Sequence, residues 1–280
     1  MDQTLDYLFV DEAGQMSLAQ VIGASRAARN LVLLGDPQQL EQPQRGAHPE
    51  GAEVAALVHA LDGHATIPDD RGLFLDVTWR LHPRICTFTS ELFYEGRLQA
   101  RPGLDGQAIH GDTPFAGSGL FYVPVEHTGN QSVAPDEVDS VAAIVAALVR
   151  DGVTWTDSKG VDRPLRASDV LIVAPYNAQV AALTERLPGV RVGTVDKFQG
   201  QEAPAVIYSM TSSSAEDAPR GMSFLYSPNR LNVATSRAKC ICILVGTTRL
   251  MEPECRTPEQ MRWANSLCRF RELAKEVVLP

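Results

Sequence analysis

The 280-residue sequence has no long apolar run, because its longest uninterrupted hydrophobic stretch is the segment 141–149. A membrane-spanning helix needs roughly 20 such residues, so the sequence predicts no membrane partner. The N-terminal segment also lacks the basic-then-apolar pattern of a secretory signal. With 44% hydrophobic and 21% charged residues, the composition is that of an ordinary globular protein. We therefore expect a soluble, cytoplasmic protein.

Cysteine and lysine are both scarce. The five cysteines show no paired CxxC spacing, which argues against a disulfide framework and against a zinc site. Only four of the 25 basic residues are lysines, and none of the four follows a glycine. The phosphate-binding loop with the pattern GxxxxGK[ST] is therefore absent from the printed chain. The net charge of −9 argues against a non-specific nucleic-acid binder but does not exclude a local basic channel.

Short apolar strands alternate with amphipathic helical segments, which is typical of a parallel α/β architecture. Two strands are predicted early in the chain, at 5–10 and 31–34, with Ser17 as the N-cap of the helix between them. Six more strands are predicted at 73–78, 120–125, 170–174, 190–195, 205–210 and 240–245. Helices are predicted at 83–94, 136–150, 177–187, 229–237 and 258–276, and exposed loops at 99–118, 151–168 and 212–228.

Two carboxylates directly follow the first predicted strand. Asp11 and Glu12 end a run of four apolar residues, and ligands bind at the carboxyl edge of open parallel sheets. One acid can hold a magnesium ion while the other orients or deprotonates an attacking water. A turn followed by a helix cap is the alternative reading of this pair.

The second predicted strand also ends in a polar turn, the segment 35–39 with the sequence GDPQQ. If the two strands are neighbours, Gln39 can approach the same site as Glu12. A glutamine there could position the terminal phosphate, as water-positioning glutamines do in other nucleotidases. Gly-Asp-Pro is also a common turn sequence, so a plain β-turn is the alternative.

Taken together, DEAGQ (residues 11–15) and GDPQQL (35–40) resemble motifs II and III of the superfamily 1 helicases. The resemblance continues in family order with TWRLHP (78–83, motif IV), APYNAQ (174–179), TVDKFQGQE (194–202, motif V) and RLNVATSRAK (230–239, motif VI). The sequence is most similar to the nonsense-mediated-decay-helicase-like branch. It departs from that branch at Thr78-Trp79, where Gln-Tyr is usual, and at Ser236, where Thr is usual.

The resemblance implies a RecA-like P-loop NTPase fold, with a parallel sheet and helices on both faces. It divides the chain into an incomplete first lobe at 1–72, with motifs II and III, and a complete second lobe at 73–280. In the family the phosphate-binding loop precedes motif II. The chain thus resembles the C-terminal part of an ATP-dependent DNA or RNA helicase, which completes a composite ATPase site and is inactive alone. Its expected partners are single-stranded DNA or RNA and the remainder of lobe one from the same parent chain.

The resemblance also assigns residues to the use of ATP and Mg²⁺. Catalytic roles fall on Glu12, Gln39, Arg80 and Arg237, and nucleotide contacts on Asp11, Gln15, Gln199 and Glu202, with magnesium at Asp11. The two arginines would reach the γ-phosphate, because a planar guanidinium fork stabilises charge spread over phosphoryl oxygens. A stand-alone binding or regulatory module that has lost hydrolysis is the alternative. Retention of the hydrolytic set favours the helicase interpretation.

Nucleic-acid contacts are predicted after two strands of the second lobe, at Tyr176, Asn177, Gln179, Thr211 and Ser212. Hydroxyl and amide groups there can bind phosphates without reading sequence. Helix caps and solvated loop side chains are the alternative for this set. Trp155, in the predicted loop 151–168, is a candidate stacking platform. For Arg230 the sequence is equally consistent with a structural and a functional role.

Overall fold

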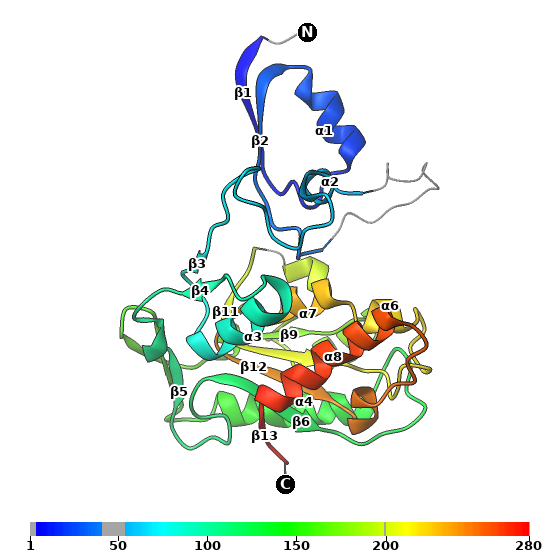
Figure 1. The fold of residues 1–280 in the computed structure, drawn as a ribbon. Helices are drawn as coiled ribbons and strands as arrows, with labels where there is room; N and C mark the ends of the chain where they lie inside the picture. Colours follow the sequence, from blue (N-terminus) through cyan, green and yellow to red (C-terminus); the bar gives the residue numbers. More distant parts are fainter. Residues whose placement is uncertain (1–3, 41–53, 199, 280) are drawn as a thin grey trace. The chain divides into compact units, whose positions relative to one another are not determined.

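The computed structural model describes residues 4–40, 54–198 and 200–279. The chain divides into two compact units, one comprising residues 1–75 with 93–95, the other 76–92 with 96–280 (Figure 1). The lobe boundary between residues 72 and 73 stays a prediction. Among the described residues, no helix has the length and apolar character needed to cross a membrane.

The first unit contains a parallel pair of strands, β1 (Leu5–Val10) and β2 (Ala28–Leu33), and two helices, α1 (Leu18–Ser25) and α2 (Ala56–Leu61). Helix α1 begins where the sequence predicts, because Ser17 forms a capping box with Gln20: the Ser17 hydroxyl accepts the Gln20 amide, and the Gln20 side chain accepts the Ser17 amide. The small core of this unit is built from Val10, Ala13, Val21 and Ala56.

The second unit is built on a six-stranded parallel sheet. Its strands are β6 (Gly119–Pro124), β9 (Val170–Val173), β10 (Arg191–Gly193), β11 (Ala203–Ser209), β12 (Ala238–Gly246) and β13 (Lys275–Glu276). The order across the sheet is β10-β9-β11-β12-β6-β13, and every neighbouring pair is parallel. The central strands are continuous hydrophobic runs because helices cover both of their faces.

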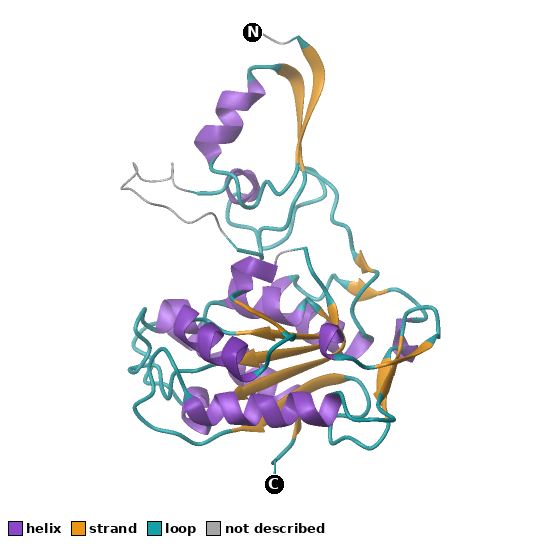
Figure 2. Cartoon of the chain, turned by 180° about the vertical axis from the view of Figure 1, so that it is seen from behind, coloured by secondary structure: helices purple, strands orange, loops and turns teal. Residues whose placement is uncertain are grey.

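Helices lie on both faces of this sheet (Figures 1 and 2). Helices α4 (Pro135–Leu148) and α5 (Asn177–Arg186) pack on one face, in a core that includes Phe121 and Val123 of β6. Tyr122 lies between those two residues and points to the other face, where the Arg271 guanidinium of α8 (Pro258–Leu273) lies 5.3 Å from its ring. Helix α3 (Pro83–Phe93) packs against α8 through the edge-to-face pair Phe88–Phe270, and α7 (Pro228–Thr235) completes the layer. The predicted α/β fold with helices on both faces is confirmed.

The predicted loops at 99–118 and 151–168 are wrong in part. They contribute a three-stranded antiparallel sheet of β5 (Ala108–His110), β7 (Thr154–Thr156) and β8 (Asp162–Pro164). Strands of three residues carry too little alternation to be recognised in the sequence. Trp155 lies on β7 and packs in the hydrophobic core, so it is not the exposed loop residue that a stacking platform requires.

The predicted strand at 73–78 is also shorter than expected. Only β3 (Val77–Thr78) forms, and it pairs with β4 (Gln99–Ala100) outside the main sheet. The sixth strand of the main sheet is instead β13, which lies within the predicted helix 258–276, since α8 ends at Leu273. The remaining short elements are α6 (Met222–Leu225) and the 3-10 turns Leu104–Gly106, Ala167–Asp169, Val195–Phe198 and Thr248–Met251.

Candidate functional site

The polar turns that follow β1 and β2 are packed against each other in the first unit. The two strands are neighbours, and the Ala13 amide donates to the Leu34 carbonyl at 2.8 Å. A Cβ on Gly14 would lie 2.6 Å from the Asp36 carbonyl oxygen, and a Cβ on Gly35 would lie 2.9 Å from the Ala13 nitrogen. The DEAGQ and GDPQQ segments therefore need glycine where their backbones meet.

Asp11 and Glu12 lie exposed at the carboxyl end of β1. Glu12 has a positive φ of 53°, and its amide donates to Asp11 Oδ1 at 2.9 Å. Gln15 Nε2 donates to Glu12 Oε2 at 3.2 Å, so the side chain of Gln15 orients the second carboxylate. This turn presents both acids at the edge of the sheet, the position that the sequence predicts.

The donor set at Asp11 fits a magnesium ion that is held mainly by a nucleotide. The described residues contain no cluster of three or more His, Cys, Asp or Glu side chains that could form a metal cage. Magnesium commonly takes one or two protein carboxylates and fills its remaining positions with water and phosphate oxygens. A single exposed carboxylate at Asp11 meets that requirement.

Asp36 organises the second turn, although it is not among the predicted site residues. Its Oδ1 accepts from the Gln38 amide at 2.9 Å, and its Oδ2 accepts from Gln39 Nε2 at 3.0 Å. The Tyr94 hydroxyl, which belongs to the same unit, donates to Asp36 Oδ2 at 2.5 Å. Gln39 is thus oriented by the aspartate of its own turn. The signal was present in Gly-Asp-Pro, since aspartate commonly bonds to the backbone two residues on.

In the second unit, side chains from motifs IV, V and VI meet in one ion-pair cluster. Arg80 Nε donates to Glu202 Oε2 at 2.6 Å, and Arg80 Nη1 donates to the Ser236 carbonyl at 3.1 Å. Lys239 Nζ lies 2.6 Å from the other carboxylate oxygen, Glu202 Oε1. Partial burial opposes ionisation of Glu202, but the hydrogen bonds from Lys239 and Arg80 outweigh it and lower the pKa of that carboxyl group.

This cluster lies where β11 and β12 begin. Glu202 precedes β11, and Ser236 and Arg237 precede β12. The Ala203 amide donates to the Arg237 carbonyl at 3.0 Å, which joins the two strand starts. The Arg237 side chain is buried. Gln199 lies outside the described residues, and Lys239 is not among the predicted site residues.

The predicted nucleic-acid residues lie at the carboxyl ends of the strands, opposite to the end where the ion-pair cluster lies. Tyr176 and Asn177 come after β9, and Thr211 and Ser212 come after β11. The seven residues of β11 span about 20 Å. This strand therefore separates Glu202, at its start, from Thr211 and Ser212, which follow its end. Asn177 is exposed, whereas Tyr176, Gln179, Thr211 and Ser212 are buried.

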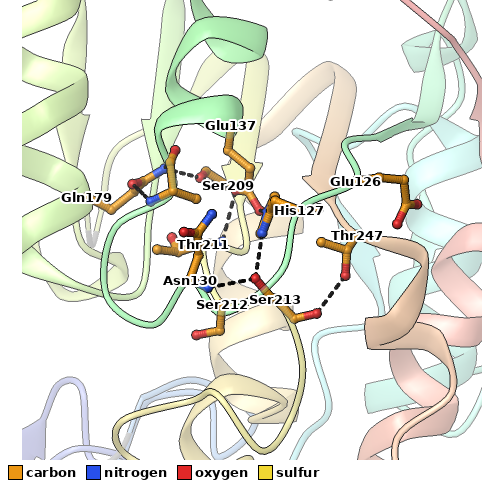
Figure 3. Close-up of polar contacts among 12 residues, drawn as sticks. Glu126, His127, Asn130, Glu137, Gln179, Ser209, Thr211, Ser212, Ser213 and Thr247 are labelled. Atoms are coloured by element: carbon orange, nitrogen blue, oxygen red, sulfur yellow. Dashed lines mark hydrogen bonds and ion pairs between the residues drawn. The ribbon is translucent and has the colours of Figure 1, made fainter.

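A buried polar network holds the segment that follows β11 (Figure 3). Glu137, in the first turn of α4, is fully buried. Its Oε2 accepts from the Ser209 hydroxyl at 2.5 Å and from the Thr211 amide at 2.9 Å, and its Oε1 lies 3.0 Å from His127 Nε2. His127 Nδ1 lies 2.7 Å from the Ser213 hydroxyl.

The network also engages two of the predicted nucleic-acid residues. Gln179 accepts from the Ala134 amide and donates to Ser209, each at 2.9 Å. Ser212 donates to the Gln131 carbonyl at 2.7 Å. These side chains therefore have partners inside the protein, and their contact with nucleic acid stays a prediction. A carboxylate in the first turn of a helix usually lies at the surface, so the sequence did not indicate that Glu137 is buried.

Comparison with known proteins places these motifs in a family. A family model described as an AAA domain matches residues 57–249. The DNA-binding protein SMUBP-2 of Mesocricetus auratus is 31% identical over 256 aligned positions, covering 84% of this chain and 24% of that protein. A putative regulator of nonsense transcripts 1 from Takifugu rubripes is 27% identical over 278 aligned positions, covering 95% of this chain and 24% of that protein.

The ATP-dependent helicase NAM7 of Saccharomyces cerevisiae is 25% identical over 299 aligned positions, covering 97% of this chain and 28% of that protein. This chain thus spans about a quarter of the length of each of these relatives. Among solved structures, the arterivirus nonstructural protein 10 helicase in complex with DNA aligns at 15% identity and a TM-score of 0.44, over 87% of this chain and 40% of that one. The family match covers more than half of the sequence, and the chain belongs to the AAA domain family, in the nonsense-mediated-decay-helicase-like and DNA-replication-helicase-like branch of superfamily 1.

Proposed function

We propose that this chain is the C-terminal part of an ATP-dependent helicase that acts on DNA or RNA. One observation supports this most strongly: Arg80, Glu202 and Arg237, which come from three separate motifs, gather at the start of β11 and β12. A module that only binds nucleic acid has no need of an arginine paired with a low-pKa carboxylate and a second, buried arginine at the start of the next strand. The arrangement is suited to a phosphoryl-transfer site, where guanidinium groups stabilise charge on the transferred phosphate.

In this proposal the motif residues complete a composite ATPase site with a phosphate-binding loop from another part of the parent chain. Asp11 would hold the magnesium ion, which neutralises phosphate charge when bound. Glu12 orients and deprotonates the attacking water, and Gln39 couples the phosphate to the nucleic-acid groove. Arg80 and Arg237 bind the γ-phosphate.

The ion-pair cluster allows Arg80 to change partners. When its guanidinium turns to a phosphate, Lys239 stays bonded to Glu202 Oε1 and keeps that carboxylate in place and charged. A phosphate replaces the carboxylate with an equally good acceptor for the guanidinium fork. Glu202, no longer shared, is then available to a hydroxyl of the nucleotide sugar.

The exposed apolar side chains of β1 support the proposal that the rest of lobe one covers this strand. Leu5, Tyr7 and Phe9 are 48%, 60% and 64% exposed, and their alternation puts them on one face of the strand. Contiguous exposed apolar patches mark interaction surfaces. Since the relatives are about four times as long as this chain, we propose that a further segment of the same parent chain packs on this face.

The proposal is tested first with the chain alone. Phosphate release from Mg-ATP is measured with and without single-stranded DNA or RNA, in parallel with oligonucleotide binding. We expect binding without turnover, because the phosphate-binding loop is absent from this sequence. Robust magnesium-dependent hydrolysis by the purified chain would show that the site is not composite.

The second test uses the parent protein. Glu12→Gln should abolish hydrolysis and preserve ATP and nucleic-acid binding, because it removes the group that deprotonates water but keeps its shape. Arg237→Lys should fail nearly as badly as Arg237→Ala, with a loss of roughly 10³–10⁵ in rate, since a point charge does not reproduce the guanidinium fork. If both variants left nucleic-acid-stimulated hydrolysis near normal, the chain would act as a binding or regulatory module.

A further inference from the structure

An arginine–aromatic cluster lies beside the predicted nucleic-acid residues. Two of its members, Arg220 and Phe224, belong to none of the helicase motifs, and the third, Arg230, is the first residue of motif VI. The Arg220 guanidinium carbon lies 3.7 Å from the centre of the Phe224 ring, and that of Arg230 lies 4.1 Å from it. Gly221, with a φ of 75°, makes the turn that begins α6. This turn brings Arg220 back over the ring of Phe224, one helical turn further along the chain.

The two arginines differ in their partners. Arg230 is mostly buried and pairs with Asp196 at 3.4 Å. Arg220 is exposed, and no carboxylate in the described part of the chain forms an ion pair with it. The nearby Asp217 carboxylate accepts instead from the Ser214 hydroxyl at 2.8 Å. In a chain with a net charge of −9, Arg220 is therefore a positive charge that no carboxylate of the described residues neutralises.

Stacking on Phe224 fixes the orientation of this charge. A guanidinium that lies over an aromatic face keeps its N–H donors in the plane of the group, directed away from the ring. Such a group loses less conformational entropy on binding than a free arginine side chain does. It is suited to the bidentate recognition of a phosphate.

The cluster is continuous with the ends of β9 and β11. The Tyr176 and Phe224 ring centres are 5.7 Å apart, and the hydroxyl oxygens of Ser212 and Tyr176 lie 3.4 Å from each other. Burial raises the pKa of Tyr176, while its hydrogen bond with Ser212 and the charges of Arg220 and Arg230 act against that rise. Arg220 thus lies close to two of the residues from which a nucleic-acid contact is predicted.

We infer that Arg220, held on the ring of Phe224, is a backbone-phosphate contact for single-stranded nucleic acid. The inference rests on the proposed function and adds a residue and a partner chemistry to it. Arg220 makes a contact that does not read sequence, because a phosphate carries no base identity. Phe224 is a positioning residue, and Arg230 with Asp196 supports the buried face of the ring.

Fluorescence anisotropy with labelled oligothymidylate and oligouridylate of equal length, over a series of salt concentrations, tests the inference on the chain itself. Each phosphate contact contributes about 0.7 to the slope of log K against log salt for single strands. Arg220→Ala should weaken binding several-fold and reduce the slope by about that amount. Arg220→Lys should keep the slope and bind less tightly than wild type. Phe224→Leu should also weaken binding, although no charge is removed.

The matched control is Arg166→Ala. Arg166 is an exposed arginine just before β9, at the end of that strand opposite to Tyr176, and its loss removes the same charge. An unchanged slope and affinity in Arg220→Ala would overturn the inference, as would an equal loss in Arg166→Ala. Failure of the proposed function is a different result, in which the wild-type chain binds neither oligonucleotide. Binding of only one of them identifies DNA or RNA as the source of the phosphate.

Discussion

Removing the carboxylate of Glu137 should destabilise the second unit more than any surface substitution. Glu137→Ala deletes the acceptor for the Ser209 hydroxyl, the Thr211 amide and the His127 ring. All of these groups are buried, so solvent water cannot replace the lost acceptor. Thr211 also has a left-handed backbone, with a φ of 72°, and its amide hydrogen bond to Glu137 helps to hold that conformation.

The magnitude follows from the number of donors that lose their partner. An unsatisfied buried donor costs about 1–3 kcal/mol. Glu137→Ala leaves two such donors, the Ser209 hydroxyl and the Thr211 amide, so we expect it to lower the free energy of unfolding by about 2–6 kcal/mol. For a unit of this size, each kcal/mol lowers the melting temperature by about 2–4 °C. The stability of Glu137→Gln should lie between those of wild type and Glu137→Ala, because the glutamine amide oxygen can still accept from the Thr211 amide.

Equilibrium urea unfolding followed by circular dichroism measures these differences. Asp139→Ala is the matched control, since Asp139 lies on the same helix and is exposed, and it should change stability by less than about 0.5 kcal/mol. A cost below about 1 kcal/mol for Glu137→Ala would refute the reasoning. It would mean that the buried donors find other partners and that the network does not hold the segment after β11.

Three further predictions concern local features. The native pKa of Glu202 is lowered, so the stability that separates wild type from Glu202→Gln should be constant above the ordinary glutamate pKa. This difference in the free energy of unfolding should disappear as the pH falls through the ordinary glutamate pKa and then through the lower native pKa. Urea unfolding at a series of pH values measures the difference, and a difference that grows in acid contradicts the prediction. Burial raises the pKa of the Cys242 thiol to about 12, whereas Cys255 is partly exposed. Iodoacetamide should therefore modify Cys255 in the native protein and Cys242 only after unfolding; peptide mapping that finds both modified at one rate rejects this. Ser17→Ala removes the capping box of α1 and should cost about 1 kcal/mol, seen as faster amide hydrogen exchange in that helix, and unchanged exchange would count against the cap.

Local sequence determined the elements whose signals lie within a few residues. The capping box at Ser17, the prolines that open α3 and α4, and the continuous apolar runs of β9 and β12 all mark their elements without help from distant residues. The ordered motifs also determined the family, because their residue types and spacing can be read directly from the chain. The short strands β5, β7 and β8 could not be read in this way, since their stability comes from pairing with one another.

Only the tertiary structure decided which charged side chains meet. Arg80 and Glu202 are 122 positions apart in the chain, and no local pattern shows that Lys239 shares the same carboxylate. A buried glutamate such as Glu137 contradicts the ordinary rule that charged residues lie at the surface, and the rule fails here because distant groups supply its hydrogen bonds. The sequence by itself therefore determined the long apolar strands, the capped and proline-opened helix starts, and the motif residues. Only the folded chain decided the partners of those residues, because the free-energy cost of burying a charged group is offset only when hydrogen-bond donors from distant parts of the sequence meet it.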